Sequence, residues 1–437
     1  MNARTRPAER PLSIAIIGSG IAGLTAADAL RHRHEITVYE AAGWVGGHTH
    51  TVDVDDGDRS VALDTGFIVC NDWTYPNFLA LLSRLGVATQ PSTMSFSLQH
   101  EVTGLEYAGT NLNALFAQRR NLLSPSFLGM LTEILRFNRE ARAWLATAAD
   151  DVTLGAWLER RRYGRALVSQ YVVPMGRAIW SASEEALLGF PARFFIEFFE
   201  RHGILSVDNQ PTWRTVVGGS REYVRALTQP FRDRIRLRTP VVAVRRLAGA
   251  VGVRPHHGAE EFHDAVVFAC HADTALGLLS DPSKAERQIL GAFPFEANDA
   301  VLHSDERLLP RAVRARAAWN YHLRRLPQPG CAVTYDLNVL QALATRRRYL
   351  LSLNLADRID PATVLARFRY EHPVYNPAGV AAQRRHAEIS GQRRSFYCGA
   401  YWRYGFHEDG VVSAQAAVEQ VAHWSQEHAK RALPRLG

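Results

Sequence analysis

The sequence predicts an α/β fold, α+β when the whole chain is counted, and three observations carry that prediction. An apolar run at 12–17 ends in a glycine-rich turn and is followed by an alanine-rich helical stretch at 20–30 and a second strand at 35–39. Strand, helix and strand within about thirty residues is typical of a parallel β-α-β unit. Strand-like segments return at 235–244, 251–254 and 264–269, and a late strand within 393–402 precedes a closing helix at 413–433. Because parts of one sheet lie at both ends of the chain, we expect discontinuous domains.

Between these parts, residues 60–71 ("SVALDTGFIVCN") predict one further strand, and the pattern from 75 to about 199 is helical. The stretch from 284 to 389 mixes strands and turns. We find no internal repeat and no low-complexity linker.

Composition excludes several classes of protein. The net charge of +8 comes almost wholly from arginine, since lysine occurs only at Lys284 and Lys430. The sequence contains no recognisable nucleic-acid-binding module, so we expect no nucleic-acid partner. The four cysteines lie far apart without C-x-x-C spacing, which argues against a metal site or a disulfide framework. No apolar run reaches the roughly 18 residues that span a bilayer. No signal-peptide pattern precedes the first strand, and we expect a cytoplasmic protein.

The first turn carries the G-x-G-x-x-G pattern of a dinucleotide site. Gly18 permits the tight turn, Gly20 lets a pyrophosphate approach the backbone, and Gly23 lets the helix pack on the sheet. Ile21 and Ala22 open the helix, whose free N–H groups and dipole favour phosphate. Glu40, at the end of the second strand, is placed to accept hydrogen bonds from ribose hydroxyls.

A second glycine pair indicates which dinucleotide binds. Gly46 and Gly47, in "EAAGWVGGHT", resemble the extended motif of FAD-binding oxidoreductases, in which a second loop closes over the pyrophosphate. We therefore predict FAD, with His48 as a neighbour of the phosphates rather than a covalent link.

Four blocks in order resemble the flavin-containing amine oxidase and protoporphyrinogen oxidase superfamily. They are the N-terminal glycine motif, "ALDTGFIV", "VVGGSREYVRAL" with "IRLRTPVVAVRR", and "FYCGAYWRYGFHEDGVVSAQAAVEQVA". The resemblance implies that Gly66 and Phe67 pass close to the isoalloxazine ring and that the backbone near Val242 clasps the adenine. It also implies that Gly399 and Gly410 are fixed points of the flavin-binding strand, loop and helix.

The resemblance implies an amine-oxidase-like architecture, with a Rossmann-like FAD-binding domain and a discontinuous substrate domain. We predict that residues 1–75, 212–283 and 390–437 form the FAD-binding domain. Residues 76–211 and 284–389 would then form the substrate domain.

A narrower resemblance concerns the substrate. "DTGFIVCNDWTYPNF", "MSFS", "GFHEDG" and the "WNY" at Trp319 are similar to a bacterial subfamily of predicted NAD/FAD-binding proteins associated with fatty-acid methyltransferases of the cyclopropane-synthase type. The resemblance implies a modified or unsaturated acyl chain as substrate and a fatty-acid methyltransferase as partner.

The chain departs from the amine oxidases at several positions. Many relatives place a lysine beside the flavin, and neither Lys284 nor Lys430 lies in a suitable context. Phe406 fills one position of the aromatic pair that frames an amine, and Ala400-Tyr401 stand where relatives have an acidic residue. Cys398 lies inside the flavin-adjacent strand, where a buried thiol more often acts as a small hydrophobe, so we predict noncovalent FAD.

The catalytic candidates are His407 and Tyr401. His407 could act as a base with a near-neutral pKa, or could hold the flavin together with Glu408. His322, next to Tyr321, is a further candidate.

The segment 115–145 joins apolar residues with Arg119, Arg120, Arg136, Arg139 and Arg142. Two interpretations remain open: an amphipathic helical pair packed on the substrate domain, or a peripheral contact with anionic lipid at the inner membrane face.

We predict an FAD-dependent oxidoreductase that acts on an apolar substrate, a modified fatty-acyl chain, by oxidation, desaturation or double-bond rearrangement. One alternative is a flavin amine or amino-acid oxidase. The other is an FAD-binding partner protein of a lipid methyltransferase.

Overall fold

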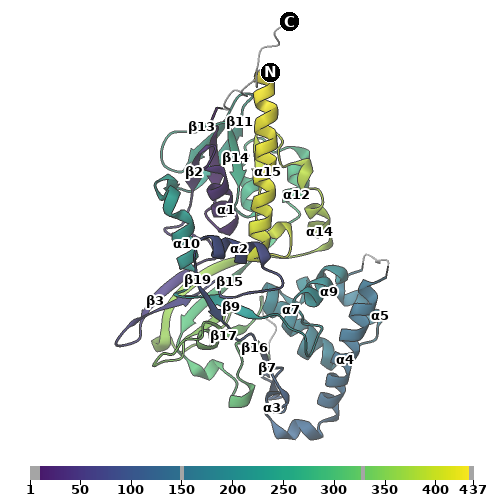
Figure 1. Ribbon diagram of the computed structural model, residues 1–437. Coiled ribbons are helices and arrows are strands. Elements are labelled where there is room, and N and C mark those ends of the chain that lie inside the picture. Colours follow the sequence, from purple (N-terminus) through teal and green to yellow (C-terminus); the bar gives the residue numbers. More distant parts are fainter. Residues whose placement is uncertain (1–9, 148–151, 326–329, 433–437) are drawn as a thin grey trace, which may run out of the picture. The chain divides into compact units, whose positions relative to one another are not determined.

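The computed structural model describes residues 10–147, 152–325 and 330–432, with side chains up to 427. The chain divides into two compact units, each assembled from separate stretches (Figure 1). The first unit comprises Met1–Gly47, Val224–Ala292 and Ala382–Gly437, and the second comprises His48–Tyr223 and Phe293–Ala381. Residues 48–75 and 212–223, predicted with the FAD-binding domain, pack within the second unit. The predicted assignment of stretches to cofactor and substrate domains stays a prediction.

A parallel sheet forms the centre of the first unit, in the strand order β10-β2-β1-β14-β20. Ile14, Ala15 and Ile16 of its central strand are fully inaccessible, as is typical of a parallel strand in a sheet covered on both faces. The strands are β1 (Ser13–Ile17), β2 (Glu35–Tyr39), β10 (Ile235–Arg236), β14 (Ala265–Phe268) and β20 (Ser395–Tyr397). The β-α-β unit predicted at the N-terminus is therefore present.

Helices α1 (Ile21–Leu30) and α15 (His407–Ala432) lie side by side in this unit (Figure 1). Its remaining helices include α11 (Ala272–Leu278) and α12 (Lys284–Leu290), and α10 (Arg221–Thr228) and α14 (Pro377–Gln383) cross the boundaries between the units. A small antiparallel sheet, β11-β12-β13, adds the strands β11 (Val241–Arg246), β12 (Val251–Pro255) and β13 (Glu261–His263).

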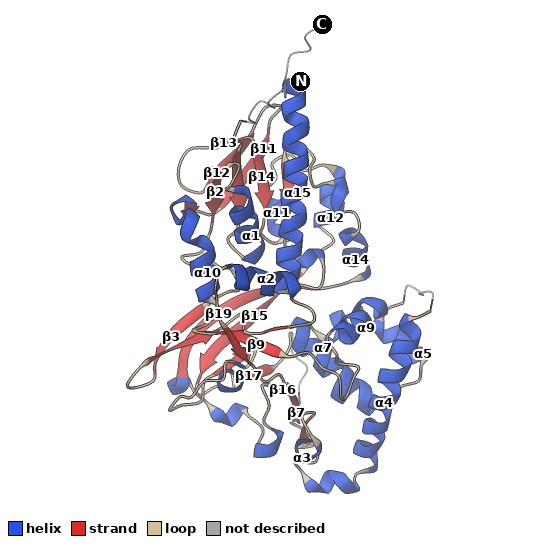
Figure 2. Ribbon diagram, in the orientation of Figure 1, coloured by secondary structure: helices blue, strands red, loops and turns tan. Residues whose placement is uncertain are grey.

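The second unit contains a seven-stranded sheet in the order β19-β15-β18-β17-β16-β7-β8, antiparallel except for the β16–β7 pair (Figure 2). Its strands are β7 (Phe96–His100), β8 (Glu106–Ala108), β15 (Phe295–His303), β16 (Trp319–Leu323), β17 (Val333–Asp336), β18 (Leu350–Leu353) and β19 (Val364–Pro373). Aliphatic and aromatic residues of these strands form a large buried apolar cluster with Phe127 and Met130 of α4.

Helices cluster beside this sheet, and two small sheets complete the unit. The helices include α2 (Pro76–Arg84), α3 (Leu112–Leu115), α4 (Pro125–Leu145), α5 (Leu154–Arg160), α7 (Val173–Trp180), α8 (Glu184–Leu188), α9 (Ala192–Arg201) and α13 (Leu337–Leu340). The small sheets are β3 (Thr51–Asp55) with β4 (Ser60–Asp64), and β5 (Cys70–Asn71), β9 (Trp213–Val216) and β6 (Thr89–Pro91). Among the described residues, no helix is both long and apolar enough to cross a membrane.

Two element predictions are wrong in detail. The strand predicted over 60–71 is interrupted, because the chain turns after Asp64 and resumes as the short strand β5. The stretch from 75 to 199 is not helical throughout, since it contains β6, β7 and β8. In both cases the deciding partner is distant in sequence, as in the pairing of β7 with β16.

Candidate cofactor site

The first glycine of the N-terminal motif occupies a backbone position that side chains rarely adopt. Gly18 has φ +105°, and its N–H donates to the carbonyl of Tyr39 at 2.9 Å, which joins the turn to β2. A Cβ on Gly18 would lie 2.8 Å from the carbonyl oxygen of Ala269. The turn after β1 therefore requires glycine for its conformation and for its packing against β14.

The other two glycines of the motif have opposite surroundings. A Cβ on Gly23 would lie 2.0 Å from the carbonyl oxygen of Gly18, so the helix packs directly on the turn. A Cβ on Gly20 would meet nothing within 4 Å. Gly20 caps α1 without a side-chain hydrogen bond, and the first turn of α1 carries no acidic residue. Ile21 and Ala22 thus open a helix with free space beside Gly20 at its start, which fits a bound pyrophosphate.

The glycine doublet packs on this turn through its backbone. The Gly46 N–H donates to the Ser19 carbonyl at 3.0 Å, and Gly46 forms a parallel bridge with Gly20. Gly47 has φ +59°, and its Cβ would lie 3.1 Å from Gly20 Cα. A side chain on Gly47 would push the second loop away from the first, and Gly46 has φ +127°, which side chains rarely adopt.

Glu40 tethers the glycine turn. Its Oε2 accepts hydrogen bonds from the Ser19 N–H at 2.9 Å and the Ser19 hydroxyl at 2.6 Å, and its Oε1 accepts from the Ala42 N–H at 2.7 Å. An ionised carboxylate can accept about four hydrogen bonds. Glu40 therefore retains capacity for a ribose hydroxyl while it orders the turn. Sequence reasoning had not assigned Ser19 to the site.

The strand predicted to clasp the adenine contains an irregularity at the expected residue. The register of β11 against β12 shifts between Val241 and Ala243, which leaves Val242 as the extra residue of a bulge. Val242 is also exposed. The backbone N–H and C=O groups of a bulged residue lie outside the regular hydrogen-bond ladder between the strands. Because Val242 is also exposed, its backbone groups are free to contact a ligand.

The C-terminal block returns to the first glycine turn. A Cβ on Gly410 would lie 2.7 Å from Ile21 Cγ2 and 3.6 Å from the Ala22 nitrogen. A Cβ on Gly399 would lie 2.4 Å from Cε1 of the Tyr401 ring. Gly410 thus lets α15 approach the start of α1, and Gly399 makes room for Tyr401.

Tyr401 and His407, which lie between these glycines, are buried. Burial lowers the pKa of His407 to about 3, so its imidazole is neutral at pH 7 rather than poised near neutrality as expected from the sequence. Burial also raises the pKa of Tyr401 well above its ordinary value, so its hydroxyl stays protonated. Glu408 is buried beside them, and Phe406 is half-buried. The catalytic roles of His407 and Tyr401 stay predictions.

Asp409 is a residue of this block that the sequence analysis did not select. Its carboxylate accepts from the Phe406 N–H at 3.0 Å, and burial raises its pKa to about 6. Phe406 precedes α15 and Asp409 is the third residue of the helix, which is half of a capping box. This box starts α15 at His407, six residues before the predicted start. The acidic residues Glu408 and Asp409 ahead of the predicted helix could have indicated this earlier start.

The remaining predicted residues lie in the second unit. A Cβ on Gly66 would lie 2.0 Å from the His48 carbonyl oxygen, and the Phe67 N–H donates to the same oxygen at 2.8 Å. Nearby, Asp64 is fully buried and accepts from the Ser220 N–H at 2.9 Å and the Ser220 hydroxyl at 2.7 Å. The second and third sequence blocks thus meet at Asp64.

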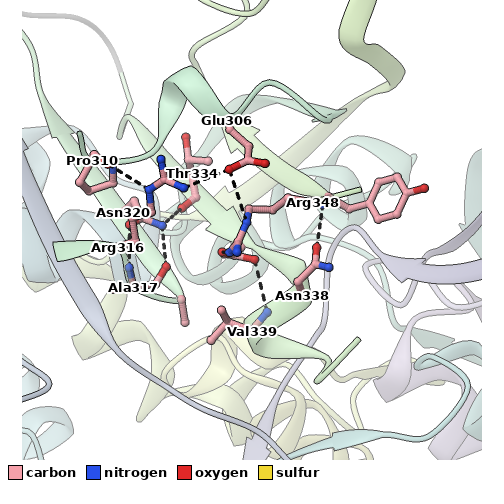
Figure 3. Close-up of polar contacts among 12 residues, drawn as sticks. Glu306, Pro310, Arg316, Ala317, Asn320, Thr334, Asn338, Val339 and Arg348 are labelled. Atoms are coloured by element: carbon pink, nitrogen blue, oxygen red, sulfur yellow. Dashed lines mark hydrogen bonds and ion pairs between the residues drawn. The ribbon is translucent and has the colours of Figure 1, made fainter. Parts of the chain in front are cut away.

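His322 and its neighbour Asn320 belong to the interior of the seven-stranded sheet. Burial lowers the pKa of His322 to about 3, and its Nε2 lies 2.9 Å from the Thr334 hydroxyl. Figure 3 shows Asn320 bonded to the backbone of Ala317 and Thr334. These contacts are those of a structural network.

The glycine turns, the tethering acid and the packed C-terminal helix define a dinucleotide-binding protein. The family model for flavin-containing amine oxidoreductases matches residues 21–306. The chain belongs to this family, which confirms the predicted family and makes FAD its cofactor and flavin oxidation–reduction its class of chemistry.

Known proteins of this kind resemble the chain to different extents. The flavin-containing amine oxidase A of Bos taurus is 27% identical over 256 residues, which cover 55% of this chain and 46% of the relative. The match thus spans about half the length of that relative.

Two solved structures show the same fold over nearly the whole chain. Cyclohexylamine oxidase from Brevibacterium oxydans IH-35A aligns with a TM-score of 0.69 at 16% identity, covering 96% of this chain and 100% of its own. A CLA-producing fatty acid isomerase from P. acnes aligns with a TM-score of 0.66 at 14% identity, covering 94% and 98%. The predicted amine-oxidase-like fold is confirmed.

FAD fits the groups that the first unit presents. The open face at Gly20 and the uncapped N–H groups of α1 suit the pyrophosphate, Glu40 suits a ribose, and the bulge at Val242 suits the adenine. That each residue contacts the cofactor stays a prediction.

Proposed function

We propose that the protein oxidises, desaturates or rearranges a double bond in an apolar substrate, a modified fatty-acyl chain. Bound FAD supplies the capacity to accept a hydride. The chain itself has to bind and orient the substrate, exclude water and manage one proton.

The observation that carries this proposal concerns the buried carboxylates of the second unit. Each already accepts hydrogen bonds or an ion pair from protein donors, which compete with a substrate ammonium group for its lone pairs. The donors are backbone N–H groups, hydroxyls, one side-chain amide and arginines. The buried carboxylates that accept from them are Asp56, Asp64, Glu106, Asp305 and Asp336. A cation taken out of water requires a partner of opposite charge or an aromatic cage. This unit therefore favours a substrate without a positive charge.

A buried arginine points in the same direction. Arg177 of α7 donates to the carbonyls of Ala182 and Gly330 and lies 6.0 Å from the centre of the Tyr321 ring. It forms no ion pair with any described residue. A buried guanidinium without a carboxylate repels an ammonium group and tolerates a neutral or anionic one.

The apolar character of the second unit supports an acyl substrate. Its main cluster combines aromatic and aliphatic side chains from β7, β16, β17 and β18, with Phe96, Trp319 and Tyr335 packed against it and only partly buried. Fatty acids are also the substrates named for the isomerase that shares this fold.

Proton handling falls to few groups in the C-terminal block. His407 is neutral, but its low pKa makes it a weak base at pH 7, and Tyr401 keeps its proton. Asp409, whose pKa lies at about 6, is the group of this block that changes charge closest to neutrality. Desaturation removes a hydride and a proton from adjacent carbons, so it also requires a proton acceptor.

Anaerobic mixing of the FAD-loaded protein with substrates tests the proposal. Oxidation or desaturation of phospholipids with methylated or unsaturated acyl chains should bleach the flavin absorbance, and rearrangement should shift a double bond with the flavin left oxidised. Cyclohexylamine or benzylamine should leave the absorbance unchanged. Rapid bleaching by amines with no response to any lipid would reverse the ranking in favour of an amine oxidase. No bleaching by either class, with every acyl chain recovered unchanged, would favour the FAD-binding partner of a lipid methyltransferase.

A further inference from the structure

Five aliphatic side chains protrude from one end of the second unit. They lie on α3, on the 3-10 turn Arg119–Leu123, on the first turn of α4 and on the 3-10 turn Val313–Ala315. Leu112, Leu123 and Val313 are 75%, 87% and 70% exposed, and Leu122 and Leu128 are 48% and 40% exposed. We call these five residues the apolar tip. α3 and the turn Val313–Ala315 contact each other. Ala108, Ala114 and Ala317 form a small buried cluster at this contact.

The exposure of Leu123 contradicts the local pattern of its helix. Ser124 caps α4 by accepting from the Phe127 N–H at 3.4 Å, which makes Leu123 the residue before the cap and Leu128 the fourth residue of the helix. Apolar residues at these two positions ordinarily cover one another as a hydrophobic staple. Here Leu123 stays almost wholly accessible, so its apolar surface is left for something outside the chain.

The tip is carried by an ordered framework. Glu106 accepts from the N–H groups of Arg311 and Ala312 at 3.1 and 2.7 Å, which fixes the start of the Val313 turn. Figure 3 shows its end, where Arg316 donates to the Pro310 carbonyl at 3.1 Å and pairs with Glu306 at 3.0 Å. The protruding side chains therefore do not belong to loosely held loops.

The exposed charge around the tip is mostly positive, with Glu306 taken up by its pair with Arg316. Arg119, Arg120, Arg311 and Arg314 are exposed and form no ion pair with any described residue. Within residues 102–132 and 307–318 the sole acidic residue is Glu106, which is buried and committed to backbone N–H groups. Apolar side chains flanked by unpaired arginines match a surface that is anionic outside and apolar within.

We propose that the apolar tip inserts into the headgroup region of an anionic lipid bilayer while these four arginines bind lipid phosphates. A second copy of the chain is a poor occupant, because a two-fold contact would oppose the arginines of both copies. Membrane binding by the tip does not depend on the proposed function. It can be measured without turnover, on vesicles whose lipids carry any acyl chain.

Co-sedimentation of the FAD-loaded protein with vesicles tests the proposal. We expect binding to vesicles of phosphatidylglycerol mixed with phosphatidylcholine, weak binding to pure phosphatidylcholine, and weakening by added salt. The double variants Leu112→Asp with Leu123→Asp, and Arg119→Glu with Arg120→Glu, should each bind at least about tenfold more weakly. All four positions are exposed, so flavin content and thermal unfolding should stay close to wild type.

Matched controls separate the tip from general effects. The control for the leucine variant is Val207→Asp, since Val207 is 70% exposed in the same unit. The control for the arginine variant is Arg33→Glu with Arg232→Glu, at two exposed positions and with the same change in net charge. Both controls should bind like wild type. Wild type that fails to sediment with anionic vesicles would overturn the proposal, as would tip variants that bind unchanged. Loss of a wild-type dimer in the leucine variant, without any vesicle binding, would assign the tip to self-association instead.

Discussion

Gly410 of α15 lies directly against Ile21 of α1, so closely that a Cβ on the glycine would come within 2.7 Å of Ile21 Cγ2. The contact joins residues almost four hundred positions apart, and it lies next to Gly20, where the pyrophosphate is expected. The C-terminal block therefore packs at the first glycine turn.

Gly410→Ala should weaken FAD binding and lower stability by about 1–3 kcal/mol, because the methyl group has no room between the two helices. The ratio of flavin to protein absorbance and a thermal unfolding curve measure the two effects. Gly277→Ala in α11 is the matched control, since a Cβ there meets nothing within 4 Å. It should be neutral or slightly stabilising. Equal behaviour of the two variants would show that the close approach does not matter.

Glu40→Arg should yield protein without FAD. The substitution removes the acceptor of the Ser19 N–H and hydroxyl and places a cation where a ribose is expected. Glu35→Arg, at the exposed start of the same strand, should keep its flavin. Flavin content after purification measures both, and full occupancy in Glu40→Arg would contradict the ribose assignment.

Asp409 should give stability a dependence on pH between about 4 and 6. Burial raises the pKa of the folded carboxyl from 3.8 to about 6, so folding favours the protonated form. Its contribution is complete below pH 4 and is lost as the pH rises through 6, up to about 3 kcal/mol for a shift of this size. Asp409→Asn keeps an acceptor for the Phe406 N–H but does not titrate.

The unfolding temperature of wild type relative to Asp409→Asn should therefore fall as the pH rises over this interval. Asp273→Asn, an exposed carboxyl in the first turn of α11, controls for the loss of a surface charge. A pH-independent difference between wild type and Asp409→Asn would contradict the burial of a titrating group.

Acid precipitation should release the flavin into the supernatant. Cys398 is fully buried at the end of β20, and burial raises the pKa of its thiol, so the nucleophilic thiolate does not form at neutral pH. Absorbance of the separated fractions gives the result. A pellet that stays yellow would demonstrate a covalent bond.

Features with local causes could be predicted from the sequence. Gly18, Gly20 and Gly23 have their predicted surroundings because the strand, turn and helix that they join are adjacent in the chain. Glu40 ends β2 beside the turn for the same reason.

Features with distant causes could not be predicted. The strand after Asp64 breaks because Gly66 meets the His48 carbonyl, and β7 forms because β16 lies beside it. The near-neutral pKa expected for His407 was wrong, since the depth of burial depends on the packing of the whole unit. Asp409 was missed although "HEDG" ahead of a helix indicates a cap.

The most direct test of the account is analysis of the lipid after a stoichiometric anaerobic incubation with the FAD-loaded protein. We expect the acyl chain either to lose a pair of hydrogens for each flavin reduced or to keep its mass with a shifted double bond and oxidised flavin. Unchanged acyl chains, together with conversion of an amine to its imine under the same conditions, would contradict it.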